Sequence, residues 1–212
     1  MVSGSVKCTT PSNPGKMTTH QSNVIPSRKA NGDILFSDHP EFVPNLTPKE
    51  IFHFGSFGGT YFRPIFSCVT GEQYTDVWNE FPRHWFPRDL KKYVVSPVCD
   101  KQINKYKVTS GTSLRYWEEK GWIDPQSPYG WVQWYMRFYA GQRSHDDDRQ
   151  IDRFNRAAGP RGRWRSNLRN KIHKKAALVA KSPKQLVDDY SISPVVRQLL
   201  QQWAFVIQQR HL

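Results

Sequence analysis

The chain has 212 residues, of which 37% are hydrophobic and 14% aromatic, and it carries a formal net charge of +13. This length allows one domain of ordinary size with a tail, and the composition predicts a core built from large rings. No apolar run reaches about 18 residues, which excludes a membrane-spanning helix. The first residues lack the apolar segment of a secretory signal, so we expect no such signal.

The cysteines bear on the compartment. Cys8, Cys68 and Cys99 are widely spaced, and none belongs to a C-x-x-C pair. An odd number without such a framework favours free thiols in a reducing compartment. We therefore expect the protein in the cytoplasm or the nucleus.

The first part of the chain predicts a tail followed by one domain. Residues 1–44 are rich in Ser, Thr, Asn and Pro, a composition that cannot offset the entropy of ordering, and we predict that they are disordered. Order is predicted to begin at Thr47-Pro48-Lys49-Glu50, the pattern of a helical capping box with proline at the first position. The predicted division is thus a tail over 1–44 and a single helical domain over 45–212.

A glycine-rich segment follows the first predicted helix. Residues 55–66 read GSFGGTYFRPIF, which predicts a tight turn and then a short strand at 60–62. A phosphate-binding loop would need a helix after it and the lysine of a P-loop. Neither is present, so we interpret the glycines as a packing turn. Prolines punctuate residues 68–108, where we predict short helices and turns with brief strands near 93–95 and 105–108.

The C-terminal half is predicted to be helical. Helices are expected over 112–120, from about Trp131 to Gly141, from Asp146 to Ala158, over 161–180, and from Pro194 behind a capping Ser193. Each of four helices has an apolar stripe. The helix from Trp131 has Trp131, Trp134, Tyr135 and Phe138, and the helix from Asp146 has Ile151, Phe154 and Ala158. The helix over 161–180 has Trp164, Leu168, Ile172 and Ala176, and the helix from Pro194 has Val195, Val196, Leu199, Leu200, Trp203, Val206 and Ile207. We therefore predict a mostly α fold, a compact multi-helix domain with one or two short strands.

Positive charge is concentrated in one region. Residues 137–175 hold 12 Lys and Arg against 4 Asp, a net charge of +8. Such a row of guanidinium and ammonium groups can neutralise phosphates and release their counterions. We predict a domain that binds nucleic acid, either DNA or RNA, through a helix over 161–175. The residues assigned to the phosphate backbone are Arg161, Arg163, Arg165, Arg169, Lys171, Lys174 and Lys175.

Two other functions remain open at this point. Asp146, Asp147 and Asp148 stand at a predicted helix start, where carboxylates cap free N–H groups. The same carboxylates could instead serve an enzyme acting on nucleic acid or a phosphorylated substrate, as acid, base or ligands of Mg²⁺. Outside that alternative we expect no metal and no cofactor, since no zinc-ligand spacing, nucleophile elbow or dinucleotide fingerprint occurs. The third possibility is a scaffold that binds an acidic protein.

Aromatic residues crowd the stretch before the aspartates. Nine of them lie between Leu114 and Tyr139, and Trp122 and Tyr139 fall outside the simplest helical stripe. An aromatic pocket beside a basic helix is what an enzyme that extrudes a base needs. The same rings are also typical of the core of a small domain, which is the interpretation we favour.

Several blocks of the sequence resemble other proteins. FGSFGGTYFRPI, INKYKVTSGTSLRYWEEKGWI, GWVQWYMRFYAGQRSHDDDRQI, GPRGRWRSNL and DYSISPVVRQLLQQWA are similar to a set of hypothetical proteins from eukaryotes, across most of 45–207. That resemblance implies a shared family without implying an activity.

A shorter likeness points to DNA. TSLRYWEEKGWIDP, residues 112–125, resembles the segment of MerR-type and excisionase-type winged-helix regulators that follows a helix-turn-helix and helps to grip DNA. The resemblance implies that Arg115 and Tyr116 contact DNA. The chain departs from that family in having Trp122 where a smaller residue is usual, and residues 88–108 lack the pattern of the preceding helix pair.

Overall fold

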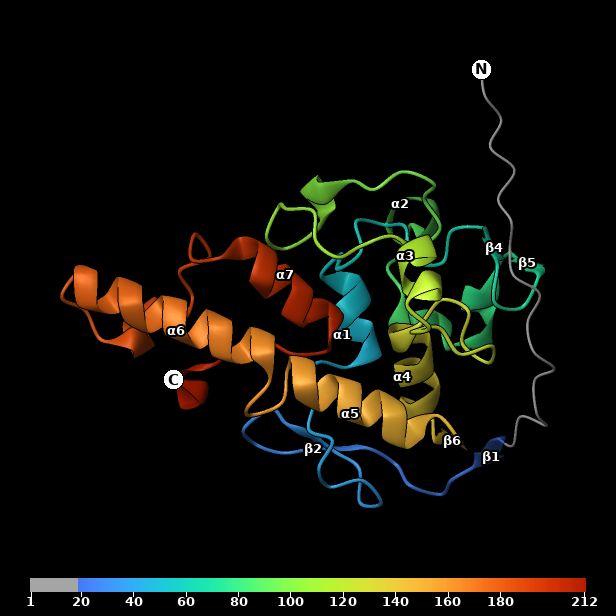
Figure 1. The fold of residues 1–212 in the computed structure, drawn as a ribbon, viewed down its shortest axis with the longest axis horizontal. Coiled ribbons are helices and arrows are strands. Elements are labelled where there is room, and N and C mark those ends of the chain that lie inside the picture. Colours follow the sequence, from blue (N-terminus) through green and yellow to red (C-terminus); the bar gives the residue numbers. More distant parts are fainter. Residues whose placement is uncertain (1–18) are drawn as a thin grey trace.

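Helices dominate the computed structural model, which describes residues 19–212 (Figure 1). The α-helices of this part of the chain are α1 (Pro48–His53), α2 (Leu90–Tyr93), α3 (Leu114–Glu119), α4 (Trp131–Tyr139), α5 (Asp147–Ala157), α6 (Arg163–Leu178) and α7 (Pro194–Gln202). Short 3-10 helices are η1 (Val77–Glu80), η2 (Arg83–Trp85), η3 (Lys101–Ile103), η4 (Pro183–Leu186) and η5 (Gln209–His211). The prediction of a mostly α fold is confirmed.

The strands are short and pair only two at a time. They are β1 (Thr19–Gln21), β2 (Ser27–Arg28), β3 (Ile34–Leu35), β4 (Ile65–Ser67), β5 (Glu72–Tyr74) and β6 (Gln142–Ser144). Three antiparallel pairs form, β1 with β6, β2 with β3, and β4 with β5, in registers that place Thr19 opposite Ser144, Ser27 opposite Leu35 and Ile65 opposite Tyr74.

The strands that the sequence predicted at 60–62, 93–95 and 105–108 do not form. Val94 ends a helical turn instead, because its N–H donates to the carbonyl of Leu90 at 2.9 Å. The side chain of Asn104 holds the third segment in a turn, since its Oδ1 accepts from the backbone N–H groups of Tyr106 and Val108, both at 3.2 Å. Because these backbone N–H groups already donate to other acceptors, they cannot donate to a neighbouring strand.

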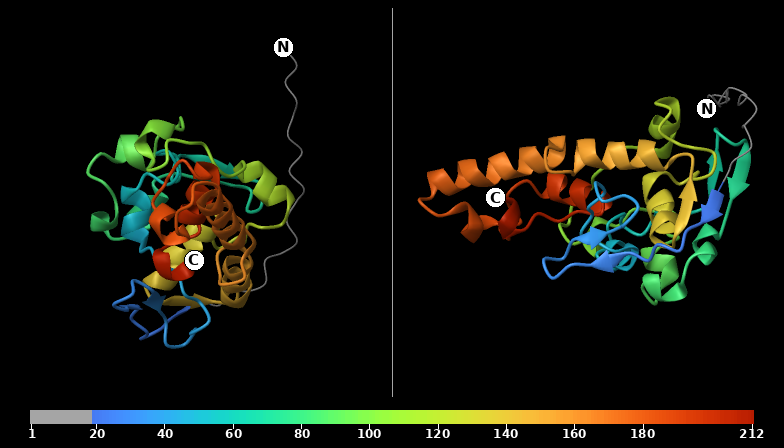
Figure 2. Two further views of the ribbon diagram at one scale, coloured as in Figure 1. Left: turned by 90° about the vertical axis from the view of Figure 1, so that its left-hand side faces the viewer. Right: turned by 90° about the horizontal axis from the view of Figure 1, so that it is seen from below.

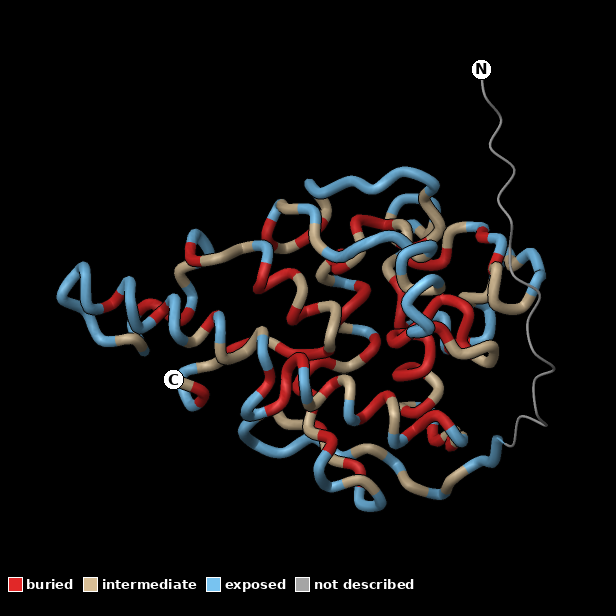
Figure 3. Tube along the Cα trace, in the orientation of Figure 1, coloured by how far each residue is buried: buried red, intermediate tan, exposed pale blue. Residues whose placement is uncertain are grey.

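The core is centred on α4, where the predicted apolar stripe is confirmed. Trp131, Trp134, Tyr135 and Phe138 are all buried, and the tube in Figure 3 shows α4 as one of the most continuously buried segments. The rings contact one another edge to face or stacked, for example Trp131 and Tyr135 at 5.2 Å between centroids. Large rings at helical spacing therefore form the centre of this core.

The N-terminal segment extends this core, which corrects the predicted tail. Residues 1–18 lie outside the described residues, but residues 34–44 are not a tail, because Ile34, Phe36 and Phe42 are buried in the main core. The Phe42 ring lies between α4 and α5, 5.6 Å from Phe138 and 4.9 Å from Phe154. The segment is anchored by these three apolar side chains. The prediction missed them because it rested on the average composition of residues 1–44, which is mostly polar.

A hydroxyl cap was predicted at two helix starts, by Thr47 and by Ser193, and only the first is present. At α1 the Thr47 hydroxyl accepts from the N–H of Glu50 at 3.2 Å, and the Glu50 carboxylate accepts from the N–H of Thr47 at 2.7 Å, so the capping box is confirmed. Ser193 precedes α7 as predicted, but it has a φ of +54° and its side chain accepts no helix N–H. Val195 on α7 is also half exposed, against its predicted place in the buried stripe.

Helix α6 projects from the rest of the molecule (Figures 1 and 2). Of its predicted apolar line, Leu168, Ile172 and Ala176 are buried, and α6 packs against α7 and η4, whereas Trp164 is only half-buried. The C-terminal half of α6 is mostly exposed along the trace in Figure 3. One narrow stripe anchors the helix, and most of its other residues beyond Arg169 are exposed.

Candidate nucleic-acid interface

The predicted cations lie on the solvent-facing sides of α6 and of the residues before it. Arg161, Arg163, Lys171, Lys174 and Lys175 are exposed, whereas Arg165 and Arg169 are half-buried. The cause is the periodicity of the helix, which turns its apolar stripe inward and leaves the residues between to water. The structure therefore presents five of the seven predicted residues as exposed charges on α6 and the residues just before it, with Arg169 partly accessible and Arg165 packed against the protein.

These cations are not neutralised by carboxylates. Residues 161–184 contain nine Lys and Arg and no Asp or Glu. None of the ion pairs found within residues 19–212 involves a cation of this segment, and Lys171 donates to the hydroxyl of Ser193 at 3.0 Å instead. Residues 1–18 hold no Asp or Glu that could pair with them either.

Other parts of the molecule use their charges differently. Arg137 pairs with Glu80, Arg143 with Asp38, and Arg28 with Glu50 at 2.7 Å. Such pairs cancel charge locally and leave little field at a distance. The net charge of the protein is consequently displayed most strongly by α6 and its flanks.

Arg165 differs from the other predicted contacts because it points partly into the protein. Its guanidinium lies 4.8 Å from the centre of the Phe205 ring. Burial, followed by repulsion from Arg210 and Arg169, lowers the pKa of Arg165. Near it, burial and the charges of Arg165 and Arg210 lower the pKa of His211 to about 4, so that this histidine is neutral at pH 7. Arg165 is thus better described as a packed residue than as a free phosphate contact.

The three aspartates do not cap α5 as predicted. Asp146 occupies the N-cap position, but its φ of −91° and ψ of −3° are already helical and its side chain accepts no helix N–H. Its carboxylate accepts instead from the side chains of Arg149 and Gln150. Asp147 accepts from the Trp134 indole N–H at 2.8 Å and from the Ser144 N–H at 2.9 Å. Asp148 is exposed.

These contacts assign Asp146 and Asp147 to the internal structure. They are only 2% and 5% exposed, and the cavity next to Asp147 has a volume of about 10 Å³, which is room for about one water molecule. Within residues 19–212, no group of three or more His, Cys, Asp and Glu side chains gathers where it could hold a metal ion. The cavity beside Asp147 is thus too small for a substrate.

Substitution of Asp147 separates a structural from a chemical role. We expect Asp147→Asn to lower the free energy of unfolding by about 1.5–3 kcal/mol, because an amide NH₂ would face the donors that the carboxylate now accepts. Thermal or urea unfolding measures the change, with Asp148→Asn as the exposed control, for which about 0.5 kcal/mol or less is expected. Equal stability of the two variants would contradict the assignment.

An aromatic cleft is the feature that the sequence did not locate. It has a volume of about 440 Å³ and lies between α3, the start of α4, α5, α6 and α7. Its walls include five tryptophans, Trp117, Trp122, Trp131, Trp164 and Trp203. The sequence suggested a ring-packed core, which holds for Trp131, but Trp122 is well exposed and Trp117 and Trp203 are half-buried. In the sequence, only the position of Trp122 outside the helical stripe indicated that some of these rings are not part of the core.

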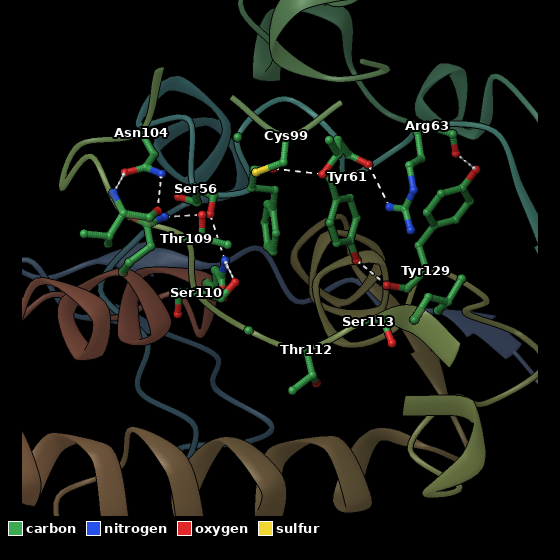
Figure 4. A pocket seen from close by; sticks show the side chains of 18 of the residues that line it. Ser56, Tyr61, Arg63, Cys99, Asn104, Thr109, Ser110, Thr112, Ser113 and Tyr129 are labelled. Carbon is green, nitrogen blue, oxygen red and sulfur yellow. Dashed lines mark hydrogen bonds between the residues drawn. The ribbon is translucent and has the colours of Figure 1, made fainter. Parts of the chain in front are cut away.

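A second cavity continues the cleft at a more polar end. It has a volume of about 290 Å³ and shares Tyr61, Ser110, Thr112, Tyr129 and Gln202 with the aromatic cleft. Figure 4 shows the hydroxyl groups of this end, including Ser110 and Thr112, together with the bond from the Tyr61 hydroxyl to the carbonyl of Tyr129. The two cavities therefore adjoin, one with mainly aromatic walls and one rich in hydroxyl groups.

The segment that resembles winged-helix regulators lies at the rim of this cleft. Arg115 on α3 pairs with Glu119 at 2.9 Å, and Tyr116 packs edge-on against Trp122. Upstream, residues 88–108 contain only the single turn α2 and the short η3, so the helix pair that precedes such a segment in that family is missing here. A contact of Arg115 or Tyr116 with DNA stays a prediction.

Two observations bear on the predicted compartment. Within residues 19–212 no helix combines the length and hydropathy needed to cross a membrane. Cys99 is a free and exposed thiol, whereas Cys68 is disulfide-bonded, so the expected free thiols hold for Cys99 and fail for Cys68. Spacing along the chain does not tell which thiols meet in the fold. The cytoplasm or nucleus stays a prediction.

Comparison with known proteins adds no assignment. No family model matches the chain, and neither a curated protein nor a solved structure does.

Proposed function

We propose that this protein binds nucleic acid through α6 and the residues just before it. The observation that carries the proposal is the row of unpaired cations on a projecting helix. A compact phosphate backbone neutralises several such charges at once and releases its condensed counterions. Electrostatic attraction of this kind acts without base recognition, so it fits DNA and RNA equally.

The dimensions of α6 suit a polyanion. Its 16 residues span about 24 Å at 1.5 Å per residue. Duplex DNA presents about one phosphate charge per 1.7 Å of axis. A helix lying along or across a groove can therefore meet several phosphates, with Arg161, Arg163, Arg169, Lys171, Lys174 and Lys175 as the contacts. Arginine adds a planar fork that matches phosphate oxygens.

A variant of the helix tests the proposal. We expect replacement of Arg163, Arg169, Lys174 and Lys175 by alanine to weaken binding to a labelled twenty-base-pair duplex by about tenfold or more at about 0.15 M salt, because four phosphate contacts are lost. Fluorescence anisotropy measures the affinity.

The matched control removes the same charge elsewhere. Lys49, Arg88, Lys91 and Lys101 are exposed cations outside α6, and their replacement by alanine should change the affinity by less than about threefold, since distant charges are screened. Equal weakening by both variants would show that net charge, and not α6, governs binding. Binding of polyglutamate without binding of any nucleic acid would favour the scaffold for an acidic protein.

A further inference from the structure

We propose that the aromatic cleft holds an unpaired base of a single-stranded nucleic acid whose neighbouring phosphates lie on α6. This inference rests on the proposed function and names its ligand more closely. It is carried by three properties of the cleft, namely its rings, its charge and its position at the root of α6.

The rings provide surfaces on which a flat ligand can stack. Trp122 and Tyr116 are exposed at the rim, while Trp117 and Trp203 are half-buried in the walls. The aliphatic side chains of Val195 and Leu199 complete one wall. A cleft of about 440 Å³ lies within the size range of small-molecule sites. Stacking of a base on such rings contributes about 1–3 kcal/mol.

The charge of the cleft disfavours a cationic ligand. None of its lining residues is Asp or Glu, and one of them is Arg153. The Arg153 guanidinium lies 5.6 Å from the ring of Trp122 and 5.6 Å from that of Trp203, so it already occupies the place that a ligand cation takes in an aromatic cage. Its bonds go to the carbonyl of Trp122 and the amide of Gln150, and no carboxylate among residues 19–212 pairs with it. A neutral ring that is attached to phosphate complements this charge.

The far end of the cleft has polar groups for the edge of a base. Ser110, Thr112 and Gln202 line both cavities. Gln198 lines the polar one, and its fully buried Oε1 accepts no hydrogen bond from the described residues, although its amide N–H donates to the carbonyl of Ser56 at 2.6 Å. Hydroxyl and amide groups of this kind bond the edges of splayed bases in single-stranded recognition.

The cleft and the cation row adjoin. Trp164 lines the cleft and stands in the first turn of α6. The Arg163 guanidinium lies over the Trp164 ring, 4.7 Å from its centre. A strand with one base in the cleft would therefore enter the cation row with its next phosphates. A duplex has no free base to place there without the cost of its extrusion.

Three probes of equal length test this inference by anisotropy. They are twelve-nucleotide oligothymidylate, the same backbone without bases, and a duplex of twelve base pairs. We expect the oligothymidylate to bind roughly 5–150-fold more tightly than the abasic strand, which is the ratio that corresponds to stacking of one base. Val195→Trp, which fills the cleft from its exposed rim, should bring this ratio to about one and leave the affinity for the abasic strand unchanged.

The controls separate the two proposals. Ile25→Trp places the same ring at an exposed site outside the cleft and should keep the wild-type ratio of the two strand affinities. If Val195→Trp does not fold, Trp122→Ala is used in its place. The α6 variant should weaken both strands equally and keep the ratio. The inference is overturned if the wild-type protein binds both strands equally, or if neither cleft variant changes the ratio of the two affinities. The proposed function stands in either case. Failure of all three probes to bind overturns both.

Discussion

Replacement of Phe42 by alanine is expected to lower the free energy of unfolding by about 3–5 kcal/mol. The Phe42 ring is fully buried and contacts the rings of Trp134 at 5.6 Å, Tyr135 at 5.8 Å and Phe154 at 4.9 Å. Its removal leaves a cavity between α4 and α5 and takes away several edge-to-face ring contacts. So large an effect from a residue in the first fifth of the chain follows only if that segment belongs to the core.

Urea denaturation with a fluorescence readout measures this change. Phe66→Ala is the matched control, since Phe66 lies on β4 with 52% of its surface exposed, and it should cost less than about 1 kcal/mol. Equal midpoints and slopes for the two variants would mean that Phe42 is solvated, and the segment before α1 would then be a tail.

Replacement of Gly59 by alanine should be comparably severe, at about 2–5 kcal/mol. Gly59 has a φ of +88°, which costs an L-residue about 1–2 kcal/mol. A methyl group there would also collide with the carbonyl oxygen of Lys92, and relief of such overpacking typically costs about 1–3 kcal/mol. The backbone itself explains this approach, because the N–H of Ser96 donates to the carbonyl of Gly59 at 3.0 Å.

Gly71→Ala isolates the collision from the strained backbone. Gly71 has a similar φ of +74°, but no atom lies within 4 Å of the position that an added methyl group would take, so only about 1–2 kcal/mol is expected. Thermal unfolding of both variants gives the difference. Equal costs for the two variants would contradict close packing at Gly59. If Gly59→Ala kept the wild-type stability but bound phosphate more weakly, the glycine-rich segment 55–66 would be a phosphate site after all.

The helices of the C-terminal half could be predicted because their periodicity is strong. In α4 and α6 the predicted apolar residues recur every three or four positions. In α6 a narrow buried stripe matches this pattern, whereas α4 is buried on almost all sides. The capping box at Thr47 is equally local, since its two partners are three residues apart. The exposure of the α6 cations could be predicted from the same pattern, because they occupy the helix positions outside the apolar stripe.

The remaining features depend on contacts between distant residues. Asp147 looked like a helix cap because the indole of Trp134 that it binds cannot be seen from neighbouring residues. The strand predicted at 105–108 is absent because the side chain of Asn104 bonds the backbone N–H groups of Tyr106 and Val108. The cleft joins rings from α3 to α7, and no single stretch of sequence reveals which of them face one another.

The salt dependence of binding tests the central claim most directly. The logarithm of the affinity for a duplex should fall linearly with the logarithm of the salt concentration, with a contribution of about −0.9 to the slope for each neutralised phosphate. Removal of Arg163, Arg169, Lys174 and Lys175 should make the slope shallower by about 3–4, whereas the control variant at Lys49, Arg88, Lys91 and Lys101 should keep the wild-type slope. An identical slope for the wild-type protein and the α6 variant would contradict the assignment of the phosphate backbone to α6.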